Sequence, residues 1–434
     1  MPILSPNAPN LAFNGVISVN YVIIGASAAG LSAAETLRRL APDAEITLIS
    51  REKEIAYSRC LLTYLLSGTI SRDDIYFRSR EALARLNLNI VSGTEVKGVN
   101  IEKREVSLSD GRQVHYDRLL AASGASPVIP DGIKGVSGQG VYTLRTLEDA
   151  DRITKNLGEV SGAVILGDGL VSVTAAQALN SRGVKVTIVG IAPHILATFL
   201  DRRSAEILQE KLTASGIELM LGRTFAEVRR GADGKLKGVA ASDGKEFQAD
   251  IVIIAVGVKP EFSFLKDSGI NSDRGLTVNE YLETSVPGIY AAGDVAQGYD
   301  RVRETIAWQP LWPNAVEQGR TAGYNMAGVE KCYGGCTNLN SLNIAGTPVI
   351  CVGQANTDRP GLESFVLSDN GSTYEKIVFA GNKLAGFILL GKTEKAGVIT
   401  SLVYQGDLSP TQKEKLLNRK FSYTSLSGLT PVGN

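Results

Sequence analysis

Short apolar runs alternate with glycine turns and amphipathic stretches along the first part of the chain. The first run, ISVNYVIIG, predicts a strand over residues 17–25, and a helix is expected from about Leu31 to Leu40. A second apolar strand, AEITLIS, is predicted over 44–50. A strand, a glycine turn, a helix and a strand within about 30 residues form a βαβ unit, which requires a parallel sheet.

The same pattern returns in the middle of the chain. Residues 163–166 predict a strand, GDGLVS predicts a turn, a helix is expected up to Ser181, and VKVTIV predicts the next strand. Two βαβ units predict two nucleotide-binding domains of similar fold.

The pattern changes beyond Met326. The segments TPVICVG and ESFVLS predict strands, YEKIVFAGNKLAGFILLG predicts a hairpin that turns at residues 381–382, and a short helix is expected near 394–404. We therefore predict an α/β protein with two Rossmann-like, three-layer (ββα) dinucleotide-binding domains and a C-terminal α+β interface domain.

The expected domain boundaries follow from these changes of pattern. They are an N-terminal extension at 1–18, a first dinucleotide domain in two pieces at 19–125 and 257–328, a second dinucleotide domain at 126–256, and the C-terminal domain at 329–434.

Composition narrows the class of function. The 434 residues include 45 Lys and Arg against 45 Asp and Glu, and this balance argues against nucleic acid as a partner because phosphate binding leaves a basic excess. No apolar run approaches the roughly 18 residues of a membrane span, and the first residues do not resemble a signal peptide. Four cysteines are too few for a disulfide scaffold, so we expect a cytoplasmic setting.

The first glycine turn has the residues of a dinucleotide site, namely Gly25, Ala26, Ser27, Ala29 and Gly30. Gly25 permits the tight turn, Gly30 lets the helix pack on the strand, and the small Ser27 lets the helix N-terminus approach a pyrophosphate. Ser50 stands where an acid often binds the adenosine ribose, so Glu52 is the best-placed acid for that role. A plain βα turn of another α/β fold is the alternative.

Five segments carry a resemblance to a known family when they are taken together and in order. They are IIGASAAG, ASGASP, AVGVKPEFSFLKDSGI, GIYAAGDVA and LWPNAVEQGRTAGYNMAG. They resemble the FAD-dependent pyridine nucleotide–disulfide oxidoreductases, nearest to the branch of rubredoxin reductases, nitrite-reductase large subunits and NADH oxidases. The resemblance covers nearly the whole chain from Tyr21. It implies FAD and a nicotinamide nucleotide, NAD(H) or NADP(H), as cofactors.

The resemblance also implies roles for single residues toward FAD. Asp294, which follows Gly293, would hydrogen-bond the ribityl chain, and an acid at a strand end can accept from sugar hydroxyls on general grounds. The other implied FAD contacts are Arg59, Val96 through its backbone, Ser123 and Gly124 at the crossover between domains, and the segment that borders the flavin ring, which includes Pro313, Ala315 and Gln318.

Cys60 lies where, by the resemblance, CoA-disulfide reductases and NADH oxidases carry a single redox cysteine. A thiolate beside a flavin can attack a disulfide or a peroxide. Leu61 and Thr63 replace the glycine and proline usual in that motif, and a leucine after the cysteine is expected to narrow access for a bulky disulfide. The alternative is a buried thiol that only packs near the ring.

The second glycine turn departs from the usual pattern. Gly167 and Gly169 are kept, but Ser172 takes the place of the third glycine, and Gly190 stands at the strand end where an acid would hold the NAD ribose. Asp168 places a carboxylate where it should repel a pyrophosphate unless its side chain turns away. We expect retained but atypical nicotinamide binding, with a site that no longer binds the nucleotide as the alternative.

The remaining cysteines do not suggest a metal site. Cys332 and Cys336 flank Tyr-Gly-Gly, with Cys351 further on, but zinc and iron–sulfur sites need about four ligands and the two histidines lie far away in sequence. No Cys-x-x-Cys or Cys-x4-Cys pair exists for a dithiol mechanism. We expect no metal.

The expected function is an FAD-dependent NAD(P)H oxidoreductase that passes electrons between a nicotinamide nucleotide and a redox protein or the subunits of a larger enzyme, as a homo- or hetero-oligomer. The alternatives are a self-contained NADH oxidase or CoA-disulfide or peroxide reductase that uses Cys60, and a flavin relay subunit whose nicotinamide site is inactive.

Overall fold

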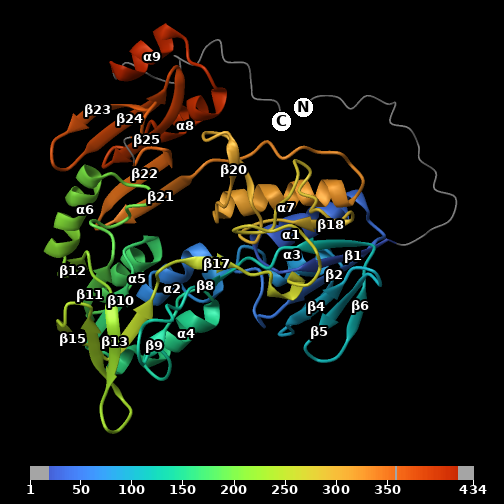
Figure 1. Ribbon diagram of the computed structural model, residues 1–434, viewed down its shortest axis with the longest axis horizontal. Helices are drawn as coiled ribbons and strands as arrows, with labels where there is room; N and C mark the ends of the chain where they lie inside the picture. Colours follow the sequence, from blue (N-terminus) through green and yellow to red (C-terminus); the bar gives the residue numbers. More distant parts are fainter. Residues whose placement is uncertain (1–18, 357–358, 419–434) are drawn as a thin grey trace.

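Two parallel sheets and one antiparallel sheet, each of five strands, form the framework of the described residues, 19–356 and 359–418 (Figure 1). The structure is a computed structural model. The predicted extension over 1–18 lies outside the described residues, as do the first two residues of the predicted opening strand. Among the described residues, no helix has the length and apolar character needed to cross a membrane.

The first parallel sheet has the strand order β18-β7-β1-β2-β3, and each neighbouring pair is parallel, as the βαβ pattern predicts. Its strands are β1 (Asn20–Ile24), β2 (Glu45–Ser50), β3 (Asn89–Ser92), β7 (Arg118–Ala121) and β18 (Ile289–Ala291). The last strand comes from much later in the chain, so two separate segments assemble this unit.

Helices and a small antiparallel sheet complete the first unit as the second and third layers. The helices are α1 (Ala28–Leu40), α3 (Arg80–Arg85) and α7 (Trp312–Met326), and the small sheet contains β4 (Val96–Asn100), β5 (Glu105–Leu108) and β6 (Gln113–His115). Helix α1 begins three residues earlier than predicted, because Ser27 is already in the extended conformation of an N-cap.

The second parallel sheet repeats this architecture with the order β12-β11-β10-β16-β9. Its strands are β9 (Val141–Tyr142), β10 (Gly162–Leu166), β11 (Lys185–Gly190), β12 (Glu218–Leu221) and β16 (Ile251–Ile254). Around it lie α2 (Leu62–Ser67), α4 (Leu147–Asn156), α5 (Leu170–Asn180), α6 (Arg202–Ala214) and the antiparallel strands β13 (Phe225–Arg230), β14 (Leu236–Ala241) and β15 (Glu246–Gln248).

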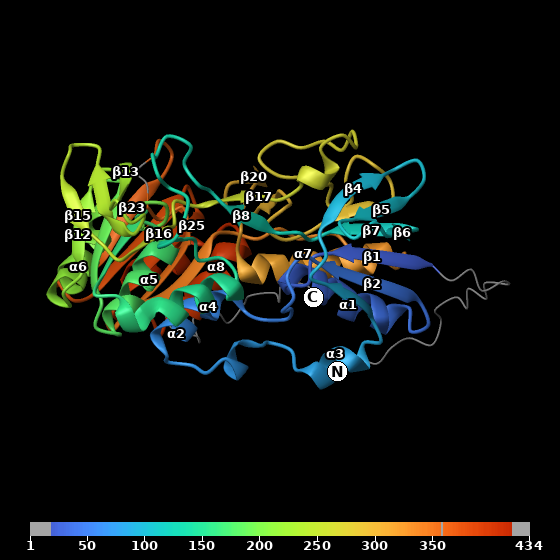
Figure 2. The ribbon, with the colours of Figure 1, turned by 90° about the horizontal axis from the view of Figure 1, so that it is seen from below.

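A two-stranded antiparallel ribbon joins the two units. Strand β8 (Ala125–Pro127) leads out of the first unit, and β17 (Val258–Pro260) leads back into it. Both views place this ribbon between the units (Figures 1 and 2). The two crossings of the ribbon therefore run side by side, and residues on them face each other.

The C-terminal part forms an antiparallel sheet with the order β21-β22-β25-β24-β23. Its elements are β21 (Leu339–Ile344), β22 (Thr347–Gly353), β23 (Glu363–Asp369), β24 (Tyr374–Ala380), β25 (Lys383–Leu390), α8 (Ala396–Gln405) and α9 (Pro410–Leu417). Strand β21 and helix α9 were not predicted. A short hairpin, β19 (Gly298–Asp300) and β20 (Thr305–Ala307), precedes α7.

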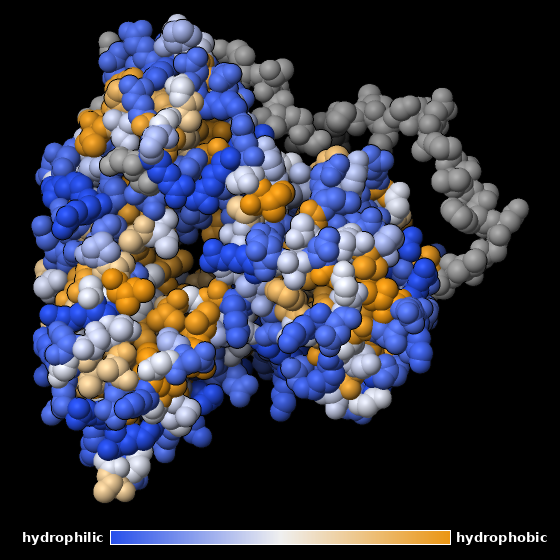
Figure 3. Space-filling model, viewed as in Figure 1, coloured by the Kyte–Doolittle hydropathy of each residue, from blue (hydrophilic) through white to orange (hydrophobic). Residues whose placement is uncertain are grey.

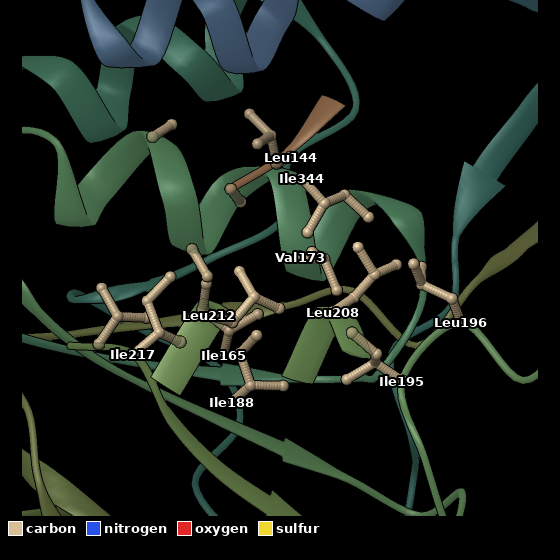
Figure 4. Packing of buried hydrophobic residues seen from close by; sticks show 14 of the residues in the cluster. Leu144, Ile165, Val173, Ile188, Ile195, Leu196, Leu208, Leu212, Ile217 and Ile344 are labelled. Atoms are coloured by element: carbon tan, nitrogen blue, oxygen red, sulfur yellow. The ribbon is translucent and has the colours of Figure 1, made fainter. Parts of the chain in front are cut away.

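A buried apolar cluster ties this C-terminal sheet to the second unit. Ile165 and Ile188 from the parallel sheet meet Val173 of α5 and Leu208 of α6, and Ile344 of β21 reaches the same cluster (Figure 4). The burial of each such side chain is worth about 1.5–3 kcal/mol relative to exposure. The C-terminal sheet thus packs on the second unit.

Helices α1 and α7 approach each other closely because α7 carries glycine at the contact. A Cβ on Gly319 would lie 2.1 Å from the Ala29 carbonyl oxygen, and a Cβ on Gly323 would lie 2.8 Å from the Thr36 Cβ. This contact holds the N-terminal half of α7 against the first glycine turn.

Candidate functional site

A cleft of about 1420 Å³ lies between the two parallel-sheet units and receives both glycine turns. The face in Figure 3 is indented between the side that carries the first unit and the side that carries the second unit and the C-terminal sheet. Pockets for one small ligand usually measure about 300–1,000 Å³, so this cleft is large enough for more than one such ligand.

The first turn places an open helix N-terminus in the cleft. Gly25 has φ +117°, and a Cβ there would lie 2.0 Å from the Ala122 carbonyl oxygen, so the turn requires glycine. Ser27 is the N-cap of α1 but makes no side-chain capping hydrogen bond, which leaves N–H groups of the first helical turn available. Such a terminus favours a negatively charged group.

Glu52 and Arg59 form an ion pair in the wall of the cleft. The Tyr57 hydroxyl donates to the other carboxylate oxygen of Glu52, and Arg59 also donates to the Arg145 carbonyl oxygen at 2.6 Å. The sequence placed Glu52 and Arg59 near the same ligand but gave no sign that they bind each other.

Asp294 lies at the floor of the cleft with a partner that was not predicted. Its Oδ2 accepts a hydrogen bond from the Arg145 guanidinium at 2.7 Å, and its carbonyl oxygen accepts from the Trp308 indole at 2.7 Å. Arg145 comes from the loop before α4, directly before the helix N-cap Thr146. Nothing in the sequence indicated that it would pair with Asp294. The Gly293 N–H is held by the Gln318 Oε1 at 2.7 Å.

The crossover residues lie where the two chain crossings meet. The Ser123 hydroxyl donates to the Glu261 carbonyl oxygen at 2.5 Å, and the Glu261 N–H donates to the Gly124 carbonyl oxygen at 3.0 Å. Ser123 and Gly124 therefore link the outward crossing to the return crossing at the cleft.

The structure brings most of the predicted FAD residues to the cleft. Those that line it are Gly25, Ala26, Ser27, Ala29, Glu52, Arg59, Val96, Ser123, Gly124, Gly293, Asp294 and Ala315. Gly30 and Gln318 are buried behind this surface, and Pro313 is exposed but does not line the cleft. Gly30 packs helix against turn, since a Cβ there would lie 1.8 Å from the Gly25 carbonyl oxygen, and Gln318 is fully buried and acts through Gly293.

Cys60 opens onto the cleft from a 3-10 turn over Arg59–Leu61. Burial between the cleft walls raises the pKa of its thiol and outweighs the hydrogen bond with the Ser58 hydroxyl, which lowers the pKa; the Asp294 carboxylate raises it further. Leu61 packs against the apolar cluster of the second unit instead of lining the cleft. The expectation that Leu61 narrows access to the thiol is therefore wrong.

The second turn faces the same cleft with Gly167, Asp168 and Gly169. Gly169 is the N-cap of α5, and a Cβ there would meet nothing within 4 Å, so the approach to this helix N-terminus is open. The Asp168 side chain turns away from the helix, because its Oδ2 accepts a hydrogen bond from the Ala192 N–H at 2.9 Å. The condition stated for the sequence is therefore met: the Asp168 side chain turns away, and the expected repulsion of a pyrophosphate does not follow from this geometry.

Ser172 and Gly190 do not line the cleft themselves. Ser172 is fully buried, and its hydroxyl donates to the Ala255 carbonyl oxygen at 3.2 Å. Gly190 ends β11 directly beneath the Asp168 side chain.

The described residues contain no group of three or more His, Cys, Asp or Glu side chains that is arranged to hold a metal ion. Cys351 is buried and donates to the Phe199 carbonyl oxygen at 2.7 Å, and Cys336 donates to the Gln309 Oε1 at 2.9 Å. All four cysteines are unpaired thiols.

These groups fit FAD at the first turn. An open helix N-terminus suits its pyrophosphate, and the Asp294 carboxylate at the floor of the cleft suits its sugar-alcohol hydroxyls. Two Rossmann-like units that share one cleft define an oxidoreductase with two dinucleotides.

Comparison with known proteins identifies the particular family. Residues 19–319 match the pyridine nucleotide-disulphide oxidoreductases, and residues 339–407 match the C-terminal domain of rubredoxin NAD+ reductase. The chain belongs to this family of flavin-dependent NAD(P)H oxidoreductases, as the five segments predicted.

Individual relatives match most of the chain. It is 37% identical over 341 residues to an NADH oxidase from Methanocaldococcus jannaschii, with 75% of each chain covered. It is 30% identical over 402 residues to the NADH-dependent phenylglyoxylate dehydrogenase subunit epsilon of Aromatoleum evansii, with 92% of this chain and 94% of the relative covered. The crystal structure of NADH:rubredoxin oxidoreductase from Clostridium acetobutylicum superposes with a TM-score of 0.75 and 27% identity, with 93% of this chain and 100% of that chain covered.

Proposed function

We propose that this protein oxidises a nicotinamide nucleotide through FAD and passes the electrons to a separate redox protein or to partner subunits. The observation that carries this choice of acceptor is the C-terminal sheet, because residues 339–407 match the C-terminal domain of rubredoxin NAD+ reductase. The raised pKa of the Cys60 thiol agrees with this choice. A sulfur relay needs a thiolate as nucleophile, whereas transfer from the flavin to a protein does not.

The residues of the chain would divide the work between the two turns. FAD, when bound, supplies the hydride and one-electron chemistry. The N-terminus of α1 would hold the FAD pyrophosphate, Asp294 would orient its hydroxyls, and Arg145 would keep the Asp294 carboxylate in place through their 2.7 Å contact. The second turn would hold the nicotinamide nucleotide on the opposite side of the cleft.

The names of two relatives support this choice of acceptor. One relative is named as a subunit of a larger dehydrogenase, and another is named as an oxidoreductase of rubredoxin. Both are matched over nine tenths of this chain or more, including the C-terminal sheet. We propose that the part at 329–434 is an interface domain, that 19–125 with 257–328 binds FAD, that 126–256 binds the nicotinamide nucleotide, and that the protein works as a cytoplasmic homo- or hetero-oligomer.

A second candidate function is a reductase of CoA-disulfide, peroxide or oxygen that uses Cys60. The exposure of Cys60 to the cleft favours it, because a substrate could reach the sulfur there. In such an enzyme the sulfur forms a covalent bond in every turnover, so its removal abolishes activity.

The deciding experiment compares Cys60→Ser with the wild type in two NAD(P)H-driven reactions, the reduction of a one-electron dye and the reduction of CoA-disulfide. Cys332→Ser is the matched control, since Cys332 is an exposed thiol that does not line the cleft. We expect dye reduction within about twofold of the wild type in both variants, because the flavin needs no sulfur to reduce a one-electron acceptor.

Three other outcomes would change the conclusion. CoA-disulfide turnover that is robust in the wild type and lost only in Cys60→Ser would establish the second candidate. Dye reduction lost in Cys60→Ser alone would show a role of the sulfur in flavin chemistry. An FAD-loaded wild type that neither NADH nor NADPH reduces under anaerobic conditions would indicate a relay subunit with an inactive nicotinamide site.

A further inference from the structure

The Asp168 side chain fills the space above Gly190. A Cβ built on Gly190 would lie 2.6 Å from the Asp168 Oδ2 and 2.6 Å from its Cβ, closer than real atoms approach. The Ala192 N–H fixes this arrangement from below at 2.9 Å. The Asp168 side chain can therefore occupy this place only because residue 190 is glycine, since any side chain at 190 would displace the aspartate.

This arrangement brings a carboxylate to a position of known importance in nucleotide-binding units. The C-terminal end of the second strand of a βαβ unit is where an acid accepts hydrogen bonds from the adenosine ribose. In this protein that strand is β11, and its last residue is Gly190. The acid missing from the strand is thus supplied from the glycine turn.

We propose that Asp168 binds the adenosine ribose hydroxyls of the nicotinamide nucleotide and makes this protein selective for NADH over NADPH. This proposal rests on the proposed function only in that the second turn binds such a nucleotide. Asp168 lines the cleft, and within the described part of the chain its Oδ1 has no hydrogen-bond partner, which leaves that oxygen for a ribose hydroxyl. A 2′-phosphate at the same place would face a carboxylate of like charge.

The surroundings of Asp168 fit the rest of an adenosine. Ile191 follows Gly190 and is 74% exposed, and Val171 on α5 is 40% exposed; both line the cleft beside Asp168. An apolar surface of this kind suits the adenine ring.

Arg223, which contacts Gly190 through its backbone, has a guanidinium that is already paired with another carboxylate. The Arg223 N–H donates to the Gly190 carbonyl oxygen at 2.8 Å, but its guanidinium pairs with Asp243 at 3.0 Å. A 2′-phosphate would have to draw Arg223 away from that carboxylate, which adds to the selection against NADPH.

Asp168→Asn tests the charge without changing the shape, because the amide oxygen can still accept from the Ala192 N–H. The probes are ADP-ribose and its 2′-phosphate, titrated by calorimetry against the FAD-loaded protein, together with KM and kcat for NADH and NADPH. We expect ADP-ribose to bind about tenfold more weakly and the preference for NADH over NADPH to fall by at least as much, carried by KM with kcat little changed. Glu218→Gln, an exposed carboxylate on the neighbouring strand β12, is the matched control and should leave both ratios unchanged.

Moving the carboxylate from position 168 to position 190 distinguishes a ribose contact of Asp168 from a purely structural role. Gly190→Asp alone should weaken both nucleotides, since the new side chain collides with Asp168. Asp168→Gly combined with Gly190→Asp moves the carboxylate back to the strand and should restore the preference for NADH. A double variant that prefers NADH no more than Asp168→Asn does would overturn the ribose contact.

Two results in the wild type would overturn the inference at once. One is an equal or greater affinity for the 2′-phosphorylated ligand, and the other is no binding of either ligand. Failure of the proposed function looks different: ADP-ribose binds with the expected dependence on Asp168, yet NADH does not reduce the flavin.

Discussion

Cys60 shows how the fold sets the reactivity of one side chain. Burial between the cleft walls raises the pKa of its thiol, so the sulfur stays protonated at neutral pH and becomes a thiolate only as the pH rises through that raised pKa. We expect alkylation of Cys60 by iodoacetamide to be slow at pH 7 and to rise about tenfold per pH unit until that pKa is reached. Mass spectrometry that follows the Cys60 peptide measures the profile. Arg145→Gln should move the profile to higher pH because Arg145 lowers the pKa, whereas full reactivity at pH 7 would show a thiolate and support the sulfur relay.

The contact between α1 and α7 explains how two distant segments come to share one site. Gly319 leaves no room for a side chain against Ala29, so even Gly319→Ala should force the helices apart and lower the free energy of unfolding by about 2 kcal/mol. FAD should dissociate more readily from this variant, because the first turn lies on α1. Urea unfolding and the fraction of retained flavin measure both effects.

Gly397→Ala is the control, since an exposed position on α8 with open space around it should gain slight stability from the better helix former. Equal stability of the two variants would show that the helices can adjust.

Asp201 joins the second unit to the C-terminal sheet and so contributes to the arrangement of the whole molecule. It caps α6 through the Ser204 N–H at 3.0 Å, accepts from the Tyr374 hydroxyl at 2.7 Å and pairs with Lys376 at 3.2 Å. We expect Asp201→Asn to lower the free energy of unfolding in urea by about 2 kcal/mol, because hydrogen bonds to a charged group are lost. Arg203→Gln, whose partner Asp369 lies on the surface of the same contact, should cost less than about 1 kcal/mol.

The Asp201 contact also predicts a dependence on pH. Burial raises the pKa of Asp201, but the bonds from Ser204, Tyr374 and Lys376 outweigh it and hold the pKa below its ordinary value. A group whose pKa is depressed by folding stabilises the protein above its unfolded pKa, near 3.8, and loses that contribution as the pH falls through the folded value. The difference in stability between the wild type and Asp201→Asn should therefore shrink below about pH 4. A difference that persists at pH 2 would assign the effect to shape instead of charge.

Much of the framework was predictable, because short-range patterns of apolar residues and glycines predict both βαβ units. Apolar strands followed by glycine turns placed β1, β2, β10 and β11, and the hairpin of β24 and β25 followed from its turn. Helix α9 was missed because its apolar residues are few. Strand β21, LNSLNI, was missed because it lacks strict alternation and contains two asparagines, which are depleted in strands. The positions of Asp294 and Cys60 came from a resemblance, whereas their environments did not.

What the sequence determined by itself is therefore local: two glycine turns that need positive φ at Gly25 and Gly167, the strands that precede them, and the family these segments identify. Only the tertiary structure decided which side chains meet. Arg145 reaches Asp294 across 149 positions, and Leu61 turns away from the cleft into an apolar cluster. Asp168 and Gly190, which read as two separate defects in a nucleotide site, fit together as one feature. The physical reason is that hydrogen bonds and packing act over a few ångströms in space, and spacing along the chain does not reveal which residues folding brings within that distance.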